Sequence, residues 1–264
     1  MTGVVMPAPV LSSSPVAAGD EPPVLALAGV RRTFGQTVAL DELSFSCAPG
    51  TVHTILGENG SGKSTLVKLL SGVVEPDRGT VHIGDHELRP CTPKRAQQLG
   101  VATVFQEVLV APNRSVIDNI WLGQDGWLRW RERGPAREQR AMAVLGELTA
   151  ARVEPDAMVG DLGLVVRHQV AIARALLRAP RVLILDESTA ALDIEDRDRL
   201  FDAVRRRVGA GTTVIFISHR LDEVLTLSDT VTVLRSGRRI VTLDKHDLSA
   251  SRLLGYLDPE GEVG

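Results

Sequence analysis

The sequence predicts an α/β protein with a mostly parallel sheet, on three observations. RVLILDE (181–187) and TTVIFISH (212–219) are short apolar runs that each end in a charged or polar residue, as buried parallel strands do. A helical pattern at about 195–208 separates them. The run VHTIL (52–56) leads into a glycine-rich turn and another helix. Because open α/β sheets bind ligands at the carboxyl ends of their strands, we expect the chemistry there.

The segments around this first strand are predicted in turn. VLALAGVRRTF (24–34) alternates apolar and polar residues in the manner of an edge strand. A helix is expected from about Lys63 to Ser71, and TVHIG (80–84) as a strand after a turn. VATVF (101–105) is short, apolar and β-branched, which favours a buried strand.

The character of the chain changes after Glu107. Strand signals become sparse up to about Val166, and helical stretches such as VIDNIWLG (116–123) and EQRAMAVLGELTA (138–150) indicate a mostly helical insertion. The last strands are expected as a hairpin over 229–243. We therefore divide the chain into a disordered N-terminal tail (1–23), a core (24–106 and 172–245), a helical subdomain (107–171) and a C-terminal tail (246–264).

Composition excludes several classes of protein. The chain has 264 residues, 44% apolar and 24% charged, with a net charge of −3, so no overall basic field favours nucleic acid. The arginine-rich stretch 128–140 is interrupted by Glu132 and Glu138, and we interpret it as a solvated face. No run approaches the roughly 18 apolar residues of a membrane helix, so a membrane role requires a partner. Two cysteines fit a reducing compartment.

GENGSGKS (57–64) matches G-x-x-x-x-G-K-[ST] in full and lies between a predicted strand and a predicted helix. Glycines let the backbone wrap closely around phosphate oxygens, and the helix adds its positive dipole end. Lys63 is expected on the β- and γ-phosphates and Ser64 on Mg²⁺. The predicted nucleotide-binding residues of the loop are Gly57, Glu58, Asn59, Gly60, Ser61, Gly62, Lys63, Ser64 and Thr65.

Polar residues at other strand ends complete this prediction. Asp186 would hold the Mg²⁺ shell, and Glu187 beside it could accept a proton from attacking water. His219 ends the next strand, where it would face the γ-phosphate. Gln106 ends the VATVF strand, and its amide is a candidate ligand of Mg²⁺ that also positions water.

These motifs, in the order LGENGSGKSTL, VFQE, VLILDESTAALD and ISHRLDEV, resemble the nucleotide-binding subunit of an ATP-binding cassette (ABC) transporter from about Val24 to Leu243. Two longer fragments (100–123 and 217–237) are most similar to ATPases of monosaccharide importers. The resemblance implies a P-loop NTPase (RecA-like) core with an antiparallel β subdomain and an inserted helical subdomain. It also implies ATP and Mg²⁺ as cofactors.

The resemblance assigns roles to single residues. Phe34 matches the aromatic residue that stacks on adenine, Gln106 the glutamine that senses Mg²⁺ and γ-phosphate, Glu187 the catalytic base and His219 the switch histidine. One segment departs from the family. Residues 162–166, LGLVV, stand where the family has Leu-Ser-Gly-Gly-Gln, the signature that clamps the γ-phosphate held by a second cassette. Gly163 removes a hydroxyl, and Val165 replaces a glycine that permits close approach.

We therefore expect a transport ATPase, peripheral on the cytoplasmic face of the cell membrane. Its implied partners are transmembrane permease subunits, a second cassette supplied by another chain in preference to a second copy, and a solute-binding protein reached through the permease. Two alternatives remain: a non-transport ABC protein, and an ATP-binding subunit with impaired catalysis. For the transport ATPase we expect no nucleic acid as a partner.

Overall fold

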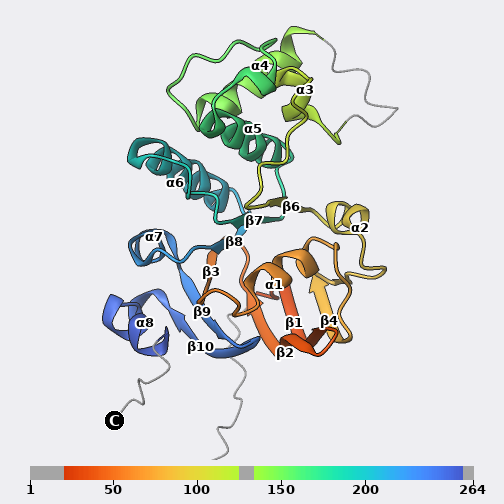
Figure 1. Cartoon of the computed structure of the whole chain (residues 1–264), viewed down its shortest axis with the longest axis vertical. Helices are drawn as coiled ribbons and strands as arrows, with labels where there is room; N and C mark the ends of the chain where they lie inside the picture. Colours follow the sequence, from red (N-terminus) through yellow and green to blue (C-terminus); the bar gives the residue numbers. More distant parts are fainter. Residues whose placement is uncertain (1–20, 125–133, 258–264) are drawn as a thin grey trace, which may run out of the picture.

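The computed structural model describes residues 21–124 and 134–257. Within them lie two sheets, a group of helices at one end and further helices along the larger sheet (Figure 1). The strands are β1 (Leu25–Phe34), β2 (Thr37–Cys47), β3 (Val52–Leu56), β4 (Arg78–Ile83), β5 (His86–Glu87), β6 (Val101–Val104), β7 (Val182–Asp186), β8 (Thr213–Ile217), β9 (Thr230–Arg235) and β10 (Arg238–Asp244).

The helices lie between these strands and after the last of them. They are α1 (Lys63–Leu70), α2 (Pro93–Gln98), α3 (Val116–Trp121), α4 (Pro135–Gly146), α5 (Leu164–Leu177), α6 (Ile194–Gly209), α7 (Leu221–Leu227) and α8 (Ala250–Leu257), with short 3₁₀ turns η1 (Val159–Asp161) and η2 (Lys245–Asp247).

The larger sheet has the strand order β10-β9-β3-β8-β7-β6. All neighbouring pairs from β9 to β6 are parallel, and β10 joins by an antiparallel hairpin. Strands β3, β7 and β8 are buried at every position, which explains their continuous apolar runs. The carboxyl ends of β3, β6, β7 and β8 therefore meet at one edge of the sheet, where the predicted site residues follow.

The smaller sheet is antiparallel, in the order β2-β1-β4-β5. Here one expectation was wrong: β1 is not an edge strand, because it pairs with β2 on one side and β4 on the other. Its alternating pattern comes from one covered face instead. Leu25, Leu27 and Val30 point into a core shared with α1 and α2, while Ala28 lies on the exposed face.

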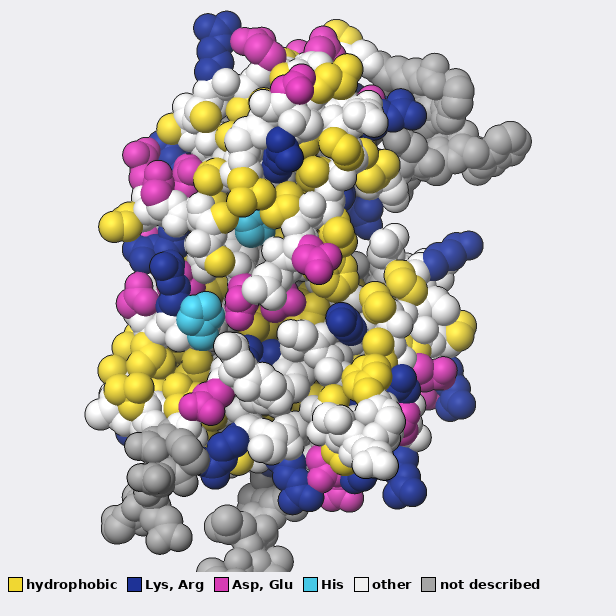
Figure 2. Space-filling view, viewed as in Figure 1, with side chains coloured by type: hydrophobic (Ala, Val, Ile, Leu, Met, Phe, Trp, Pro, Cys, Tyr) yellow, Lys and Arg dark blue, Asp and Glu magenta, His cyan; other side chains and the backbone are white. Residues whose placement is uncertain are grey.

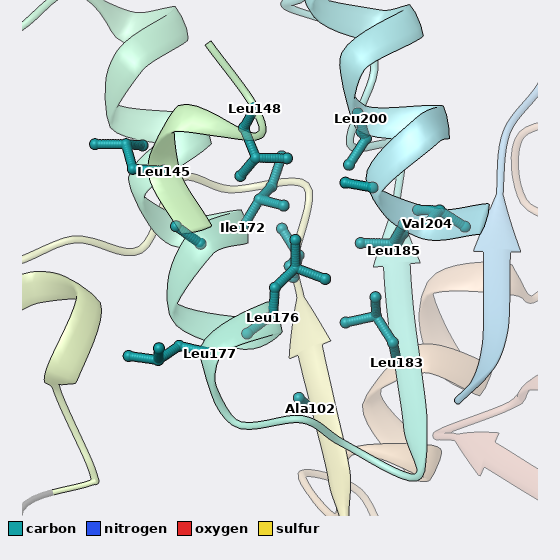
Figure 3. Close-up of a cluster of buried hydrophobic side chains, with 14 of the residues drawn as sticks. Ala102, Leu145, Leu148, Ile172, Leu176, Leu177, Leu183, Leu185, Leu200 and Val204 are labelled. Carbon is teal, nitrogen blue, oxygen red and sulfur yellow. The ribbon is translucent and has the colours of Figure 1, made fainter. Parts of the chain in front are cut away.

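The helical insertion is present as α3, α4 and the first half of α5, but its predicted boundary at 171–172 falls inside α5. That helix is continuous, and it contacts α3 and α4 as well as β6. Its Ile172 and Leu176 lie in one apolar cluster with Leu183 and Leu185 of β7 and with residues of α6 (Figure 3). One hydrophobic core therefore joins the helical subdomain to the sheet.

The structure bears differently on the two predicted tails. Residues 1–20 of the N-terminal tail lie outside the described residues, as do residues 128–133 of the arginine-rich stretch. The prediction of a C-terminal tail over 246–264 was wrong for its described residues, 246–257, which form part of η2 and all of α8. Leu253 of α8 is fully buried against β9 and β10, whereas Leu254 is exposed, and hydrophobic side chains gather on the surface over this helix (Figure 2).

Candidate nucleotide site

The loop between β3 and α1 has the backbone of a phosphate cradle. Gly60 and Gly62 adopt φ of +82° and +106°, values that side chains with a Cβ rarely permit. A Cβ on Gly62 would lie 2.5 Å from the carbonyl oxygen of Ala39, and one on Gly57 would lie 2.5 Å from that of Leu234. The glycine spacing is thus required by the packing of the loop against β2 and β9.

Lys63 begins α1 and is buried, with its ammonium group turned over the loop. Nζ donates hydrogen bonds to the carbonyl oxygens of Gly57 (2.7 Å) and Glu58 (2.8 Å). Burial lowers the pKa of Lys63, and the carboxylates of Glu187 and Asp186 act in the opposite direction. A cation held this close to a loop of main-chain N–H groups suits an anionic ligand.

Asp186 and Glu187 follow β7 with different environments. Asp186 ends the strand and is buried; desolvation, reinforced by the neighbouring charge of Glu187, raises the pKa of Asp186 to about 6. Glu187 has φ of +47°, a conformation unusual for a residue with a side chain. Its N–H donates to the carbonyl oxygen of Ile217 (3.0 Å), which ties this strained turn to the end of β8.

Two further side chains converge on Glu187. Gln106, after β6, donates from Nε2 to Glu187 Oε2 at 2.9 Å. His219, after β8, places Nδ1 3.5 Å from Glu187 Oε1. Three strand ends, separated widely in sequence, therefore bring an amide, a carboxylate and an imidazole together, as the sequence predicted.

These groups line one open cavity of about 790 Å³ together with the glycine-rich loop. The full lining is Thr37, Val38, Ala39, Gly57, Glu58, Asn59, Gly60, Gly62, Lys63, Ser64, Thr65, Gln106, Asp186, Glu187 and His219. Of the predicted loop residues only Ser61 is absent from this lining. It is buried, and its Oγ has no hydrogen-bond partner among the described residues.

Phe34, like Ser61, is a predicted site residue that does not line the cavity. Its ring is 46% exposed, with the guanidinium of Arg32 4.8 Å from the ring centroid. The sequence analysis instead missed Thr37, Val38 and Ala39, which line the cavity from the start of β2. Phe34 pairs directly with Thr37 across the turn, so it lies beside this wall of the cavity.

The chemistry of the lining fits a nucleotide with a magnesium ion. The loop supplies N–H groups and an ammonium for phosphates, and Ser64, Gln106 and Asp186 supply the hydroxyl, amide and carboxylate oxygens that Mg²⁺ accepts. The described residues hold no group of three or more His, Cys, Asp or Glu side chains that could bind a metal by themselves. A magnesium ion here would therefore be held by the Asp186 carboxylate, by the neutral oxygens of Ser64 and Gln106, and by the ligand's phosphates.

Comparison with known proteins agrees with this site. Residues 40–190 match the family model described as ABC transporter. This chain belongs to the ABC transporter family. It is 38% identical over 256 residues to ribose import ATP-binding protein RbsA 3 of Rubrobacter xylanophilus, covering 92% of this chain and 51% of that protein. It is 42% identical over 220 residues to ribose import ATP-binding protein RbsA 2 of Streptomyces coelicolor, and the match covers 82% of this chain and 42% of that protein.

The fold of this ABC protein is that of an isolated cassette. The crystal structure of the ADP conformation of MJ1267, an ATP-binding cassette of an ABC transporter, superposes with a TM-score of 0.75 at 26% identity, covering 89% of this chain and 98% of that one. The chain spans about half the length of the curated relatives it matches. Within the residues that the structure describes, no helix is both long and apolar enough to cross a membrane.

The segment in the place of the ABC signature begins α5. Gly163 is the residue before the first turn, and it offers no side chain to the free N–H groups of the helix. Leu164 is 61% exposed. Arg167 turns back, and its Nε donates to the carbonyl oxygen of Leu162 at 2.7 Å. The helix start is thus apolar on its surface, although its main-chain N–H groups remain.

Proposed function

We propose that the chain binds and hydrolyses ATP and that this reaction powers solute import through a membrane permease. The observation that carries the proposal is the meeting of Lys63, Asp186, Glu187, Gln106 and His219 around one cavity at the ends of four neighbouring strands. Such a set supplies phosphate binding, metal ligation and proton acceptance within one space.

The proposed roles follow from position. The loop 57–62 and Lys63 hold the phosphates. Ser64, Gln106 and Asp186 hold Mg²⁺, which offsets the charge of the phosphate oxygens. Glu187 accepts the proton of the attacking water, because its carboxylate faces the cavity and is held by Gln106. His219 orients the same carboxylate from the other side.

We further propose a sugar, and within that class a monosaccharide, as the transported solute. The support is that the two relatives are ribose import ATP-binding proteins, with identities of 38% and 42%. The permease and any solute-binding protein would set the choice of solute. On this proposal the chain is peripheral to the cytoplasmic face of the membrane and binds no nucleic acid.

The second cassette is proposed to come from a different chain or segment. The start of α5 at Gly163 lacks the hydroxyl that would bind a phosphate held by the partner, and Val165 occupies a position that suits glycine. One such hydrogen bond to a charged group contributes roughly 1.5–3 kcal/mol. The chain's own cavity would be competent, and the partner's site that it completes would be weak.

That same observation favours one second candidate: an ATP-binding subunit that regulates a complex without hydrolysing ATP efficiently. The two candidates differ in turnover and agree in nucleotide binding. A non-transport ABC protein differs from both in lacking a permease partner.

The experiment is a calorimetric titration of the purified chain with ATP and Mg²⁺, followed by phosphate release. Lys63→Ala should abolish measurable binding, whereas Lys94→Ala, an exposed lysine of α2, should leave it unchanged. Absence of binding by the wild-type chain would refute the nucleotide site. Binding without phosphate release, also in the presence of the permease complex, would select the regulatory candidate.

A further inference from the structure

Glu223 of α7 carries a carboxylate that is completely buried. It accepts three side-chain hydrogen bonds. Oε2 accepts from Ser218 Oγ (2.6 Å) and from Thr189 Oγ1 (2.8 Å), and Oε1 accepts from Arg220 Nη1 (3.1 Å). A buried charge is costly unless hydrogen bonds satisfy it in this way. The carboxylate of Glu223 therefore holds its three donor side chains in place.

The donors belong to the two loops that carry the site. Thr189 lies two residues after Glu187, and Ser218 immediately precedes His219. Ser218 Oγ also accepts a hydrogen bond from the N–H of Arg220 (3.1 Å), on the other side of His219. One carboxylate oxygen therefore holds the side chains of Thr189, two residues after Glu187, and of Ser218, next to His219, at the same point.

The hydrogen bonds of Glu223 lie close to Glu187 and His219, the two side chains that they would align. Glu187 Oε1 and His219 Nδ1 are 3.5 Å apart, and the main chains of the two loops are joined by the bond from the N–H of Glu187 to Ile217. That main-chain bond fixes the bases of the loops, and the Glu223 contacts fix the segments beyond them. Without Glu223, two buried hydroxyl groups and a guanidinium would lose their shared acceptor.

We propose that Glu223 is a positioning residue that holds Glu187 and His219 in their productive relation across the cavity. The inference rests on the proposed ATPase function of this site. Glu223 is not among the residues that line the cavity, so it acts on turnover rather than on nucleotide affinity. It also ties the turn at 189–193 to the His219 loop, so displacement of either loop is transmitted to the other.

The test is Glu223→Gln, which keeps the size of the side chain but replaces one acceptor oxygen by a donor. We expect kcat to fall roughly tenfold, the effect of losing one hydrogen bond to a charged group, with the KM and Kd for ATP within about twofold of wild type. In a His219→Ala background the additional loss from Glu223→Gln should shrink to less than about twofold, because coupled residues are non-additive.

A matched control is Ser228→Ala. Ser228 is also fully buried and bonded to a side-chain hydroxyl, Thr54 Oγ1 at 2.6 Å, but it lies before β9, away from His219 and Glu187. It should lower the melting temperature without changing kcat. An unchanged kcat in Glu223→Gln, or an equal loss with and without His219, would overturn the proposal.

Hydrogen exchange separates this proposal from the proposed function. Glu223→Gln should accelerate amide exchange in 187–193 and 217–220 while the loop 57–62 stays at the wild-type rate. Wild-type protein that binds ATP but releases no phosphate, also in the presence of the permease complex, refutes the ATPase proposal. The exchange rates then decide whether Glu223 holds the two loops. Equal exchange in the variant and wild type would refute that role.

Discussion

Gln106 Nε2 donates a 2.9 Å hydrogen bond to Glu187 Oε2, although 81 residues separate the two side chains in sequence. Each follows a strand of the same parallel sheet, and their strands, β6 and β7, are neighbours. Gln106 also begins the segment that leads into the helical subdomain. Movement of that subdomain would therefore shift the group that holds the proposed general base.

Glu187→Gln should remove the proton acceptor and leave nucleotide binding intact. Phosphate release is expected to fall about 100- to 10,000-fold, the usual contribution of a general base. Calorimetry should give an ATP affinity close to that of the wild type, because the Glu187 side chain bonds to Gln106 and lies beside His219, and an amide keeps its size. Light scattering on the ATP-bound variant then reports whether two copies associate. A variant that retained wild-type turnover would exclude Glu187 as the base.

Gly163→Ser should be accepted by the fold and should strengthen the start of α5. A Cβ at this position meets no atom within 4 Å, and the backbone of Gly163 is extended, as in a serine that caps a helix. Replacing glycine by serine at a helix cap is worth only a few tenths of a kcal/mol, so thermal unfolding should show a small rise.

The functional effect of the same substitution is expected in the assembled pair. If α5 faces a phosphate in a second cassette, the added hydroxyl should raise turnover of that site, and Gly163→Ala is the matched control without a hydroxyl. Equal rates for the serine and alanine variants would mean that this hydroxyl contacts no phosphate.

The sequence predicted the candidate site better than it predicted the boundaries of the fold. Lys63, Asp186 and Glu187 were placed correctly in one cavity because each follows a strongly apolar strand, and parallel strands bring their ends to one edge. This prediction did not require knowledge of which strands are neighbours in the sheet. Gln106 and His219 were predicted from their positions after strands together with the other motifs and the family resemblance, and both line the same cavity.

Other features depend on tertiary contacts that local patterns do not encode. Ala39 lines the cavity because its carbonyl oxygen packs against the loop glycine Gly62 and against Gly237 of the distant hairpin. Glu223 lies in the sequence LDEV, which has the composition of a surface helix, yet tertiary packing buries it completely. Helix α5 serves both the subdomain and the sheet, so no change of pattern marks its division.

Phe34→Ala tests the predicted adenine-binding residue, which lies outside the cavity lining. If the ring stacks on adenine, its loss should weaken ATP binding by roughly 1–3 kcal/mol, as for other base–aromatic contacts. Phe34→Tyr, which keeps the ring face, should bind normally. An ATP affinity that does not change in Phe34→Ala would assign the base to the wall formed by Thr37 and Val38 instead.

His53 should make the stability of the protein depend on pH. It lies fully buried in β3, stacked on Phe45 with ring centroids 5.2 Å apart and 2.8 Å from Thr232 Oγ1. Burial lowers the pKa of His53 to about 4, against 6.5 for an exposed histidine. Between these values the unfolded chain binds a proton that the folded protein refuses, so the free energy of unfolding falls as the pH falls from 6.5 toward 4.

The measurement is urea unfolding of wild type and His53→Gln at pH 7 and at pH 4.5. The linkage for His53 alone amounts to about 2–3 kcal/mol over this window, and the variant should lack that part of the decline. Some decline should persist, because burial also lowers the pKa of His168 and acts in the same direction. Above pH 7 both histidines are neutral in either state, so the stability difference between the two proteins should become constant there. If the two proteins lose stability in parallel between pH 7 and 4.5, His53 is protonated in the folded state and its burial excludes no proton.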